Sequence, residues 1–196
     1  MPARLIPLIG VGTAVVLFAI ATSQFPGGYH WTHDYICTLL RSSPDRLLPS
    51  KIRMLAIAAV LCYSAALGFL YYQLSVFSPT RFLGKTLQIA GIASVVYGSF
   101  AMTVIHDLVV TISFISSVIA AAALMHWLYL RRAHSLLLLG AMALMAQGVT
   151  AVLFYGRHFG MALSLAQKVE IALTTGWLLS SHASLIPLET KGREKT

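Results

Sequence analysis

Long apolar runs recur along this chain, and they restrict its possible folds more than any other feature. Each run is roughly 18 residues or longer, which as a helix rising about 1.5 Å per residue crosses the ~30 Å hydrocarbon layer of a membrane. The chain of 196 residues is 58% hydrophobic and only 10% charged, whereas a soluble domain carries about 25% charged residues. Because so little polar material cannot cover a water-facing surface, the sequence predicts an all-α, polytopic membrane protein.

The positions of the apolar runs predict a bundle of six transmembrane helices. They form one transmembrane domain over residues 1–188, and residues 189–196 form a charged cytoplasmic tail. The predicted spans are 5–25, 52–77, 86–105, 108–130, 135–155 and 161–186. The first run resembles a signal peptide with Arg4 before it, but its length and the lack of a small-residue cleavage site favour a retained span.

The distribution of basic residues predicts the orientation of the bundle. Six spans place both termini on one side. The side that holds the termini carries eight Lys and Arg residues and the opposite side five, so the positive-inside rule predicts cytoplasmic termini. We therefore expect an integral protein of the bacterial inner (plasma) membrane. The net charge of +8 suits anionic lipid headgroups. No basic stripe with interleaved aromatics appears, so no nucleic acid is expected as a partner.

The first loop contains the most unusual stretch of the chain, PGGYHWTHDYICT at residues 26–38. We expect its part from Trp31 to Leu40 to form a short interfacial helix, because Trp31 and Tyr35 suit the headgroup level. Gly27 and Gly28 permit a sharp turn after the first span.

Three loops are predicted to emerge on one membrane face and to bring polar side chains together. These side chains are His30, His33, Asp34, His106, Asp107, Arg157 and His158. We expect His33 or Asp34 to fold back within contact range of His106, with His158 close by. The competing interpretations are ordinary interfacial residues and, for Asp107, a helix N-cap.

This predicted patch contains the ligand types of a catalytic zinc site, which has three protein ligands and an open position for water. The candidate ligands are His33, His106 and His158, and a bound zinc would lower the pKa of its water toward about 7. In such an enzyme Asp34 or Asp107 would orient an imidazole, and Arg157 would bind a phosphate or an oxyanion.

Two charged residues interrupt the last predicted span. Lys168 and Glu170 lie about 10 to 13 Å inside it and about 200° apart around the helix, so they cannot pair with each other. Charges at this depth are costly and mark functional candidates. We predict that Glu170, or Lys168 facing inward, acts in the patch as an acid, a base or an anion clamp. Alternatively, the last helix starts later and Lys168 reaches the interface with its long side chain.

A second set of histidines suggests a different cofactor. His126 and His182 lie at similar depth near the other membrane face, as two axial ligands of a b-type haem would. His106 and His158 would form a second such pair. This arrangement would be that of an electron carrier.

Several short motifs resemble a known family. HDYICTLL in the first loop, His106 in VIHDLVVTISF, and Gln167-Lys168 with Trp177 downstream are similar to a bacterial six-helix membrane protein family of unknown function. That family is distantly similar to the Frag/DRAM group, whose first loop reads roughly aromatic-Ile-Ser-x-Leu-Gly; here Cys37 and Leu40 replace the serine and the glycine. The resemblance implies a six-helix bundle and a loose link to lipid remodelling, but no established reaction.

Three functional classes follow. The first is a hydrolase or transferase that acts on a lipid ester or amide at the extracytoplasmic face, through the His/Asp patch and with zinc as the candidate metal. The second is the haem carrier. The third is a non-catalytic bundle that binds lipid, a membrane-protein partner or a second copy of itself, with small residues on the fifth helix permitting close contact.

Overall fold

A computed structural model describes residues 5–40, 48–100, 103, 105–156 and 160–186. Over these residues the chain forms six α-helices, one 3₁₀ turn and no strand, so the predicted all-α class is confirmed. The helices are α1 (Leu5–Ser23), α2 (Ser50–Val76), α3 (Arg81–Ser99), α4 (His106–Leu130), α5 (His134–Tyr155) and α6 (Met161–Leu185). The 3₁₀ turn η1 (Ile36–Leu39) is the helical part of the first loop and is shorter than predicted.

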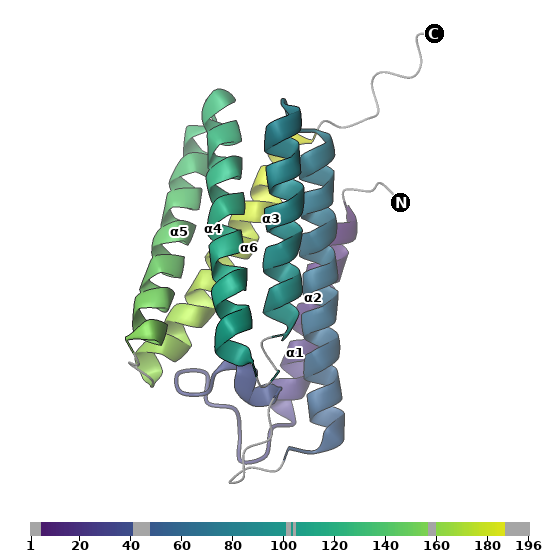
Figure 1. Cartoon of the computed structure of the whole chain (residues 1–196). Helices are drawn as coiled ribbons and strands as arrows, with labels where there is room; N and C mark the ends of the chain where they lie inside the picture. Colours follow the sequence, from purple (N-terminus) through teal and green to yellow (C-terminus); the bar gives the residue numbers. More distant parts are fainter. Residues whose placement is uncertain (1–4, 41–47, 101–102, 104, 157–159, 187–196) are drawn as a thin grey trace.

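The helices run alternately up and down in one bundle (Figure 1). Each helix packs on the next along the chain, and α6 also packs on α2 as it crosses obliquely behind α3 and α4. We call the end where α1 begins and α6 ends the termini end. The opposite end, where α1, α3 and α5 finish and the first loop lies, is the loop end. The helix ends that flank the three connections thus lie at one end of the bundle, and their convergence on one membrane face stays a prediction.

The starts of the third and fourth helices differ from the predicted ones for local reasons. The third helix begins at Arg81 and ends at Ser99, earlier than the predicted 86–105. The reason is local, because the Thr80 side chain accepts a hydrogen bond from Leu83 N–H and caps the helix there. The fourth helix begins at His106, and Asp107 lies within its first turn rather than at the N-cap, where its charge still favours the helix dipole.

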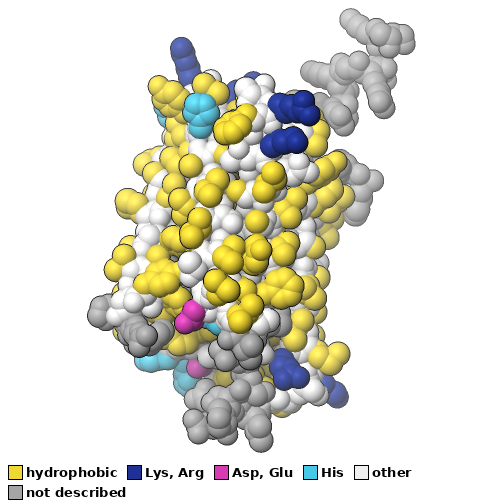
Figure 2. All heavy atoms as spheres, in the orientation of Figure 1, with side chains coloured by type: hydrophobic (Ala, Val, Ile, Leu, Met, Phe, Trp, Pro, Cys, Tyr) yellow, Lys and Arg dark blue, Asp and Glu magenta, His cyan; other side chains and the backbone are white. Residues whose placement is uncertain are grey.

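Four helices are long and apolar enough to cross a membrane, namely α1, α2, α4 and α5. Their outward faces carry large apolar side chains, such as Val15, Leu61, Ile119 and Met145. Figure 2 shows hydrophobic side chains as a band over the middle of one face of the molecule, with Lys and Arg gathered near the two ends. An exposed apolar belt of this kind indicates an integral membrane protein.

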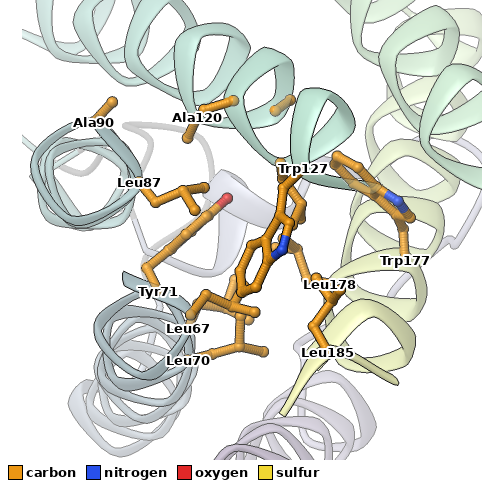
Figure 3. Packing of buried hydrophobic residues seen from close by; sticks show 14 of the residues in the cluster. Leu67, Leu70, Tyr71, Leu87, Ala90, Ala120, Trp127, Trp177, Leu178 and Leu185 are labelled. Atoms are coloured by element: carbon orange, nitrogen blue, oxygen red, sulfur yellow. The ribbon is translucent and has the colours of Figure 1, made fainter. Parts of the chain in front are cut away.

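The main core lies in the half of the bundle near the termini end. Trp127 on α4 and Trp177 on α6 are almost fully buried, together with leucines from α2, α3, α4 and α6 (Figure 3). Gly91 permits the close approach of the Tyr71 ring, because an added Cβ would lie 2.3 Å from it. Helix association in lipid depends on such close packing, since lipid is as apolar as the side chains.

A second, smaller apolar cluster lies at the loop end. It joins Phe25 after α1 and Ile52 on α2 to Leu39 and Leu40 of the first loop. Leu39 has no exposed surface. The first loop is therefore held against α1 and α2 by buried apolar side chains, and its polar face is left to meet α6.

Hydrogen bonds between helices add to the packing. Ser99 Oγ donates to Ser64 Oγ on α2 over 2.7 Å, and Ser113 Oγ donates to the Ser94 carbonyl over 2.7 Å. In a membrane such polar contacts between small side chains favour specific pairing of helices.

Candidate functional site

The first loop turns back sharply after α1. Gly27 and Gly28 have φ values of 78° and 84°, a left-handed conformation that glycine adopts at little cost. The sharp turn predicted from these glycines is confirmed. Tyr29 and Trp31 then pack edge-on, with ring centroids 5.3 Å apart, and both rings contact Phe18 of α1.

Asp34 organises the segment that follows. Its carboxylate Oδ2 accepts a hydrogen bond from the His30 N–H over 2.8 Å, and its carbonyl accepts one from the Tyr29 hydroxyl over 3.0 Å. Burial, followed by the nearby Asp34 carboxylate, raises the pKa of Tyr29 above its usual range. Tyr29 is thus a neutral hydrogen-bond donor that holds the Asp34 carbonyl in place.

The next residues dock on the beginning of α6. The Tyr35 hydroxyl accepts a hydrogen bond from Gly160 N–H over 2.5 Å and lies 3.4 Å from the carbonyl of the same glycine. The Ile36 N–H donates to Gln167 Oε1 over 3.3 Å. We call this contact, formed by residues 34–36 with Gly160, Ser164, Gln167 and Lys168, the loop–α6 junction.

Lys168 lies at the centre of the loop–α6 junction. Its Nζ donates to the Asp34 carbonyl over 2.7 Å, to Ser164 Oγ over 2.7 Å and to the Ser164 carbonyl over 3.3 Å. The Tyr29 ring lies 5.6 Å from Nζ, within cation–π range. The three hydrogens of an ammonium therefore have three oxygen acceptors, an arrangement that suits the charged form of lysine.

Ser164 is the most enclosed member of the loop–α6 junction. It has no exposed surface. Its hydroxyl donates to the Asp34 carbonyl over 2.8 Å while it accepts from Lys168. Because Ser164 and Lys168 are four residues apart, they lie on one face of α6, and Gly160 is the residue that precedes the helix. A serine hydroxyl within hydrogen-bond reach of a lysine amine is the arrangement of a Ser-Lys nucleophile and base.

The two charges on α6 have separate partners. Lys168 contacts the first loop, whereas the polar neighbour of Glu170 is Thr150 on α5. Their partners thus lie on different elements, consistent with the prediction that they do not pair with each other.

The predicted histidine patch is only partly within the described residues. His33 is exposed, and its Nδ1 lies 2.7 Å from Thr32 Oγ1. His106 Nδ1 lies 3.1 Å from Asp107 Oδ1, and the His106 ring contacts Phe154 on α5. Arg157 and His158 lie outside the described residues, and the contact of His33 or Asp34 with His106 stays a prediction.

The described residues contain no group of three or more His, Cys, Asp or Glu side chains that could hold a metal. The predicted zinc ligands include His158, which is not described, so the triad with His33 and His106 stays a prediction. Nothing in the described part of the chain supports it.

The histidines predicted for haem lie in different surroundings. His126 is exposed on α4. His182 is buried, and its Nε2 lies 2.6 Å from Gln73 Oε1 on α2. An imidazole nitrogen that is engaged with an amide is not available as an axial ligand in this arrangement. The haem pair therefore stays a prediction without support from these contacts.

Sequence reasoning did not identify Gly160 and Ser164, and it gave Tyr35 and Gln167 no role in the loop–α6 junction. A signal for one of them was present, because Ser164 precedes Lys168 by four residues on a predicted helix, where such residues are neighbours. No sequence signal indicated that the first loop would reach α6. No family model, curated protein or solved structure matches the chain.

Proposed function

We propose that this protein hydrolyses or transfers the acyl group of a lipid ester or amide, with Ser164 as the nucleophile and Lys168 as the base. The observation that carries the proposal is the 2.7 Å separation of Ser164 Oγ and Lys168 Nζ beneath the first loop. The apolar exterior of the bundle points to a substrate that reaches the site from the membrane.

The proposal places all six helices across the membrane, with cytoplasmic termini and the loop end at the outer face. Four helices have the length and composition for this, and α6, with 25 residues, has the length despite its polar residues. Membership of the six-helix family similar to the Frag/DRAM group is part of the proposal, and it fits a lipid substrate.

The reaction begins with attack by Ser164 Oγ on the acyl carbonyl carbon. Lys168 Nζ, uncharged at that moment, takes the hydroxyl proton and returns it to the departing alcohol or amine, whose bond to the acyl carbon breaks. Water or an acceptor hydroxyl then attacks the acyl–serine ester, and Lys168 Nζ passes the proton of the attacking group to Ser164 Oγ as the bond between Oγ and the acyl carbon breaks. The acyl group leaves as an acid or as a new ester. The zinc ligands predicted in the patch are not required for this route and remain a separate proposal.

The arrangement with the first loop docked is the resting form in this mechanism. Ser164 is fully covered, and its hydrogen points to the Asp34 carbonyl rather than to the amine. Movement of the first loop away from α6 would take the Asp34 carbonyl away from the side chains of Ser164 and Lys168. Ser164 O–H would then be free to turn toward Nζ, and Gly160 N–H, released from Tyr35, would become a donor one turn away.

An alkyl fluorophosphonate, which labels activated serines, tests the proposal on the purified protein in lipid nanodiscs. We expect labelling of the natural protein and at least tenfold less labelling of Ser164→Ala and of Lys168→Met. Ser181→Ala is the matched control, because Ser181 is equally buried on the same helix but is not part of the loop–α6 junction.

A loosened loop sharpens this test. Tyr35→Phe removes the bond to Gly160 and should increase labelling severalfold by exposing Ser164. The proposal is wrong if the Tyr35→Phe protein is not labelled, or if the label persists when Ser164 is replaced.

A non-catalytic bundle that binds lipid or a partner is the second candidate. The three oxygen acceptors around Lys168 Nζ favour it, because they suit a permanent ammonium that holds the first loop. Lys168→Arg separates the two candidates. Arginine stays charged and can still hold the loop, but it cannot act as a base. If the Lys168→Arg variant folds but is no longer labelled, the result supports the enzyme. If the natural protein itself is folded but not labelled, the result supports the non-catalytic bundle.

A further inference from the structure

A small surface cavity of about 280 Å³, open to the outside, lies at the termini end, where α2 is joined to α3. Its polar lining consists of Ser75, Ser78, Thr80, Arg81, Lys85 and Gln88. Two of these side chains are cations and none is an anion. The carboxylates of the described residues, Asp34, Asp107 and Glu170, belong to the first loop, the first turn of α4 and the half of α6 near the loop end. Among the described residues, the charges that line the cavity are therefore all positive.

The two cations are arranged on one side of the cavity. Arg81 and Lys85 are one helical turn apart, so they lie on the same face of α3. Neither forms an ion pair with another described residue. Gly84 between them lies against α2, because a Cβ there would be 2.6 Å from the Ser75 carbonyl oxygen. This close approach of the helices places the hydroxyl-bearing end of α2 opposite the cations.

Side chains, rather than the free N–H groups of the helix start, make this cavity attractive to an anion. Thr80 Oγ1 already accepts from Leu83 N–H, and the Thr80 carbonyl accepts from Gly84 N–H. The two cations and the neighbouring hydroxyl and amide groups match the needs of a phosphate, which takes charge-assisted hydrogen bonds on several oxygens.

The outer edge of the cavity is apolar. Tyr72 and Val76 line it and are 48% and 61% exposed, and Phe82 beside Arg81 is 81% exposed. Figure 2 shows Lys and Arg side chains at this end of the molecule directly above the apolar band. In a spanning bundle this position is the level of lipid headgroups, with acyl chains alongside the exposed rings.

We propose that this cavity binds an anionic phosphate group through Arg81 and Lys85. The apolar edge favours the phosphodiester of an anionic phospholipid as the source over free phosphate. The site is independent of the proposed reaction at the loop end, because it lies at the opposite end of the bundle.

Native mass spectrometry of the protein released from nanodiscs tests the proposal. We expect phosphatidylglycerol to be retained over phosphatidylcholine, and the double variant Arg81→Gln/Lys85→Gln to lower this retention roughly tenfold to thirtyfold, at about 1 kcal/mol for each cation. Arg131→Gln/Arg132→Gln is the matched control, since it removes two cations at the same end from outside the cavity. It should change retention less than twofold.

Inorganic phosphate, titrated into the detergent-solubilised protein, distinguishes the two sources. If 10 mM phosphate displaces the lipid and binds in an Arg81- and Lys85-dependent way, the cavity is a site for free phosphate. If phosphate fails to compete, the site belongs to the lipid. Equal retention of phosphatidylglycerol by the cavity variant and the control variant overturns the proposal.

Discussion

The two ends of the bundle are held together by different interactions. At the termini end, leucines and two tryptophans from four helices fill the core, and the buried His182–Gln73 contact lies beside them. At the loop end, a smaller apolar cluster fixes the first loop on α1 and α2, and hydrogen bonds from residues 34–36 join it to α6. The difference separates a rigid packed half from a half whose closure depends on a few polar contacts.

This difference bears on function. A packed core of side chains in fixed positions resists rearrangement. A junction of a few hydrogen bonds can open at a small cost in free energy, because each bond contributes only about 0.5–1.5 kcal/mol net. We therefore expect movement at the loop end, where the proposed Ser164–Lys168 pair lies, and little movement at the termini end. Four predictions test this contrast.

The largest effect is expected from a cavity in the main core. Leu128→Ala removes a side chain without exposed surface. It should lower the free energy of unfolding in detergent by about 2 kcal/mol, the lower end of the usual range because lipid already surrounds apolar groups. Leu130→Ala on the same helix, 55% exposed, should have little effect. Equal losses in SDS titrations of both variants would contradict a packed core at this end.

An added methyl group tests the same core from the opposite direction. Gly91→Ala places a Cβ 2.3 Å from the Tyr71 ring, so α2 and α3 must separate or the ring must move. We expect a loss of about 1–3 kcal/mol, measured by thermal unfolding. Gly148→Ala is the control, since no atom lies within 4 Å of the added Cβ. A neutral Gly91→Ala would mean that this half is loosely packed.

At the loop end, the loss of one hydrogen bond should change dynamics more than stability. Tyr35→Phe removes the contact with Gly160 and should cost about 0.5–1.5 kcal/mol. Hydrogen exchange at residues 29–36 should become at least several times faster, while exchange in α4 stays unchanged. Uniform acceleration along the whole chain would show that the first loop does not open separately from the bundle.

The smallest expected effect is a dependence on alkaline pH. Because the pKa of Tyr29 is raised in the folded protein, its phenol stays protonated above about pH 10, where the unfolded chain loses the proton. The contribution of Tyr29 to the free energy of unfolding is fully present at pH values well below 10, and it is lost as the pH rises through and above 10. Between pH 9 and 10.5, the Tyr29→Phe variant should lose a few tenths of a kcal/mol less free energy of unfolding than the natural protein. An identical alkaline loss in both proteins would show that Tyr29 is not buried as described.

The ends of most helices were predictable because their causes are local. Apolar runs long enough to cross a membrane predict helices, and five of the six starts fell within two residues of the predicted positions. The exception, α3, begins five residues early because Thr80 provides an N-cap before a segment that contains two cations. That signal is also local, and it was present in the sequence.

The loop–α6 junction could be predicted only in part. The sequence identified Lys168 as a charge in need of a partner, and it identified the turn at Gly27 and Gly28. It did not identify the partner, a carbonyl oxygen of Asp34, because every residue has a carbonyl and only position distinguishes this one. Ser164 likewise resembles the other serines of the chain until the first loop covers it.

The sequence by itself determined the class of the fold, because the cost of placing apolar runs in water and the length needed to cross a membrane are properties of each segment alone. It also determined that the three loops with His and Asp residues share one end, since an alternation of helices requires this. The tertiary structure decided which side chains meet there. Asp34 lies 134 positions before Lys168, and contacts over such a separation depend on the packing of α1, α2 and α6, not on any local pattern.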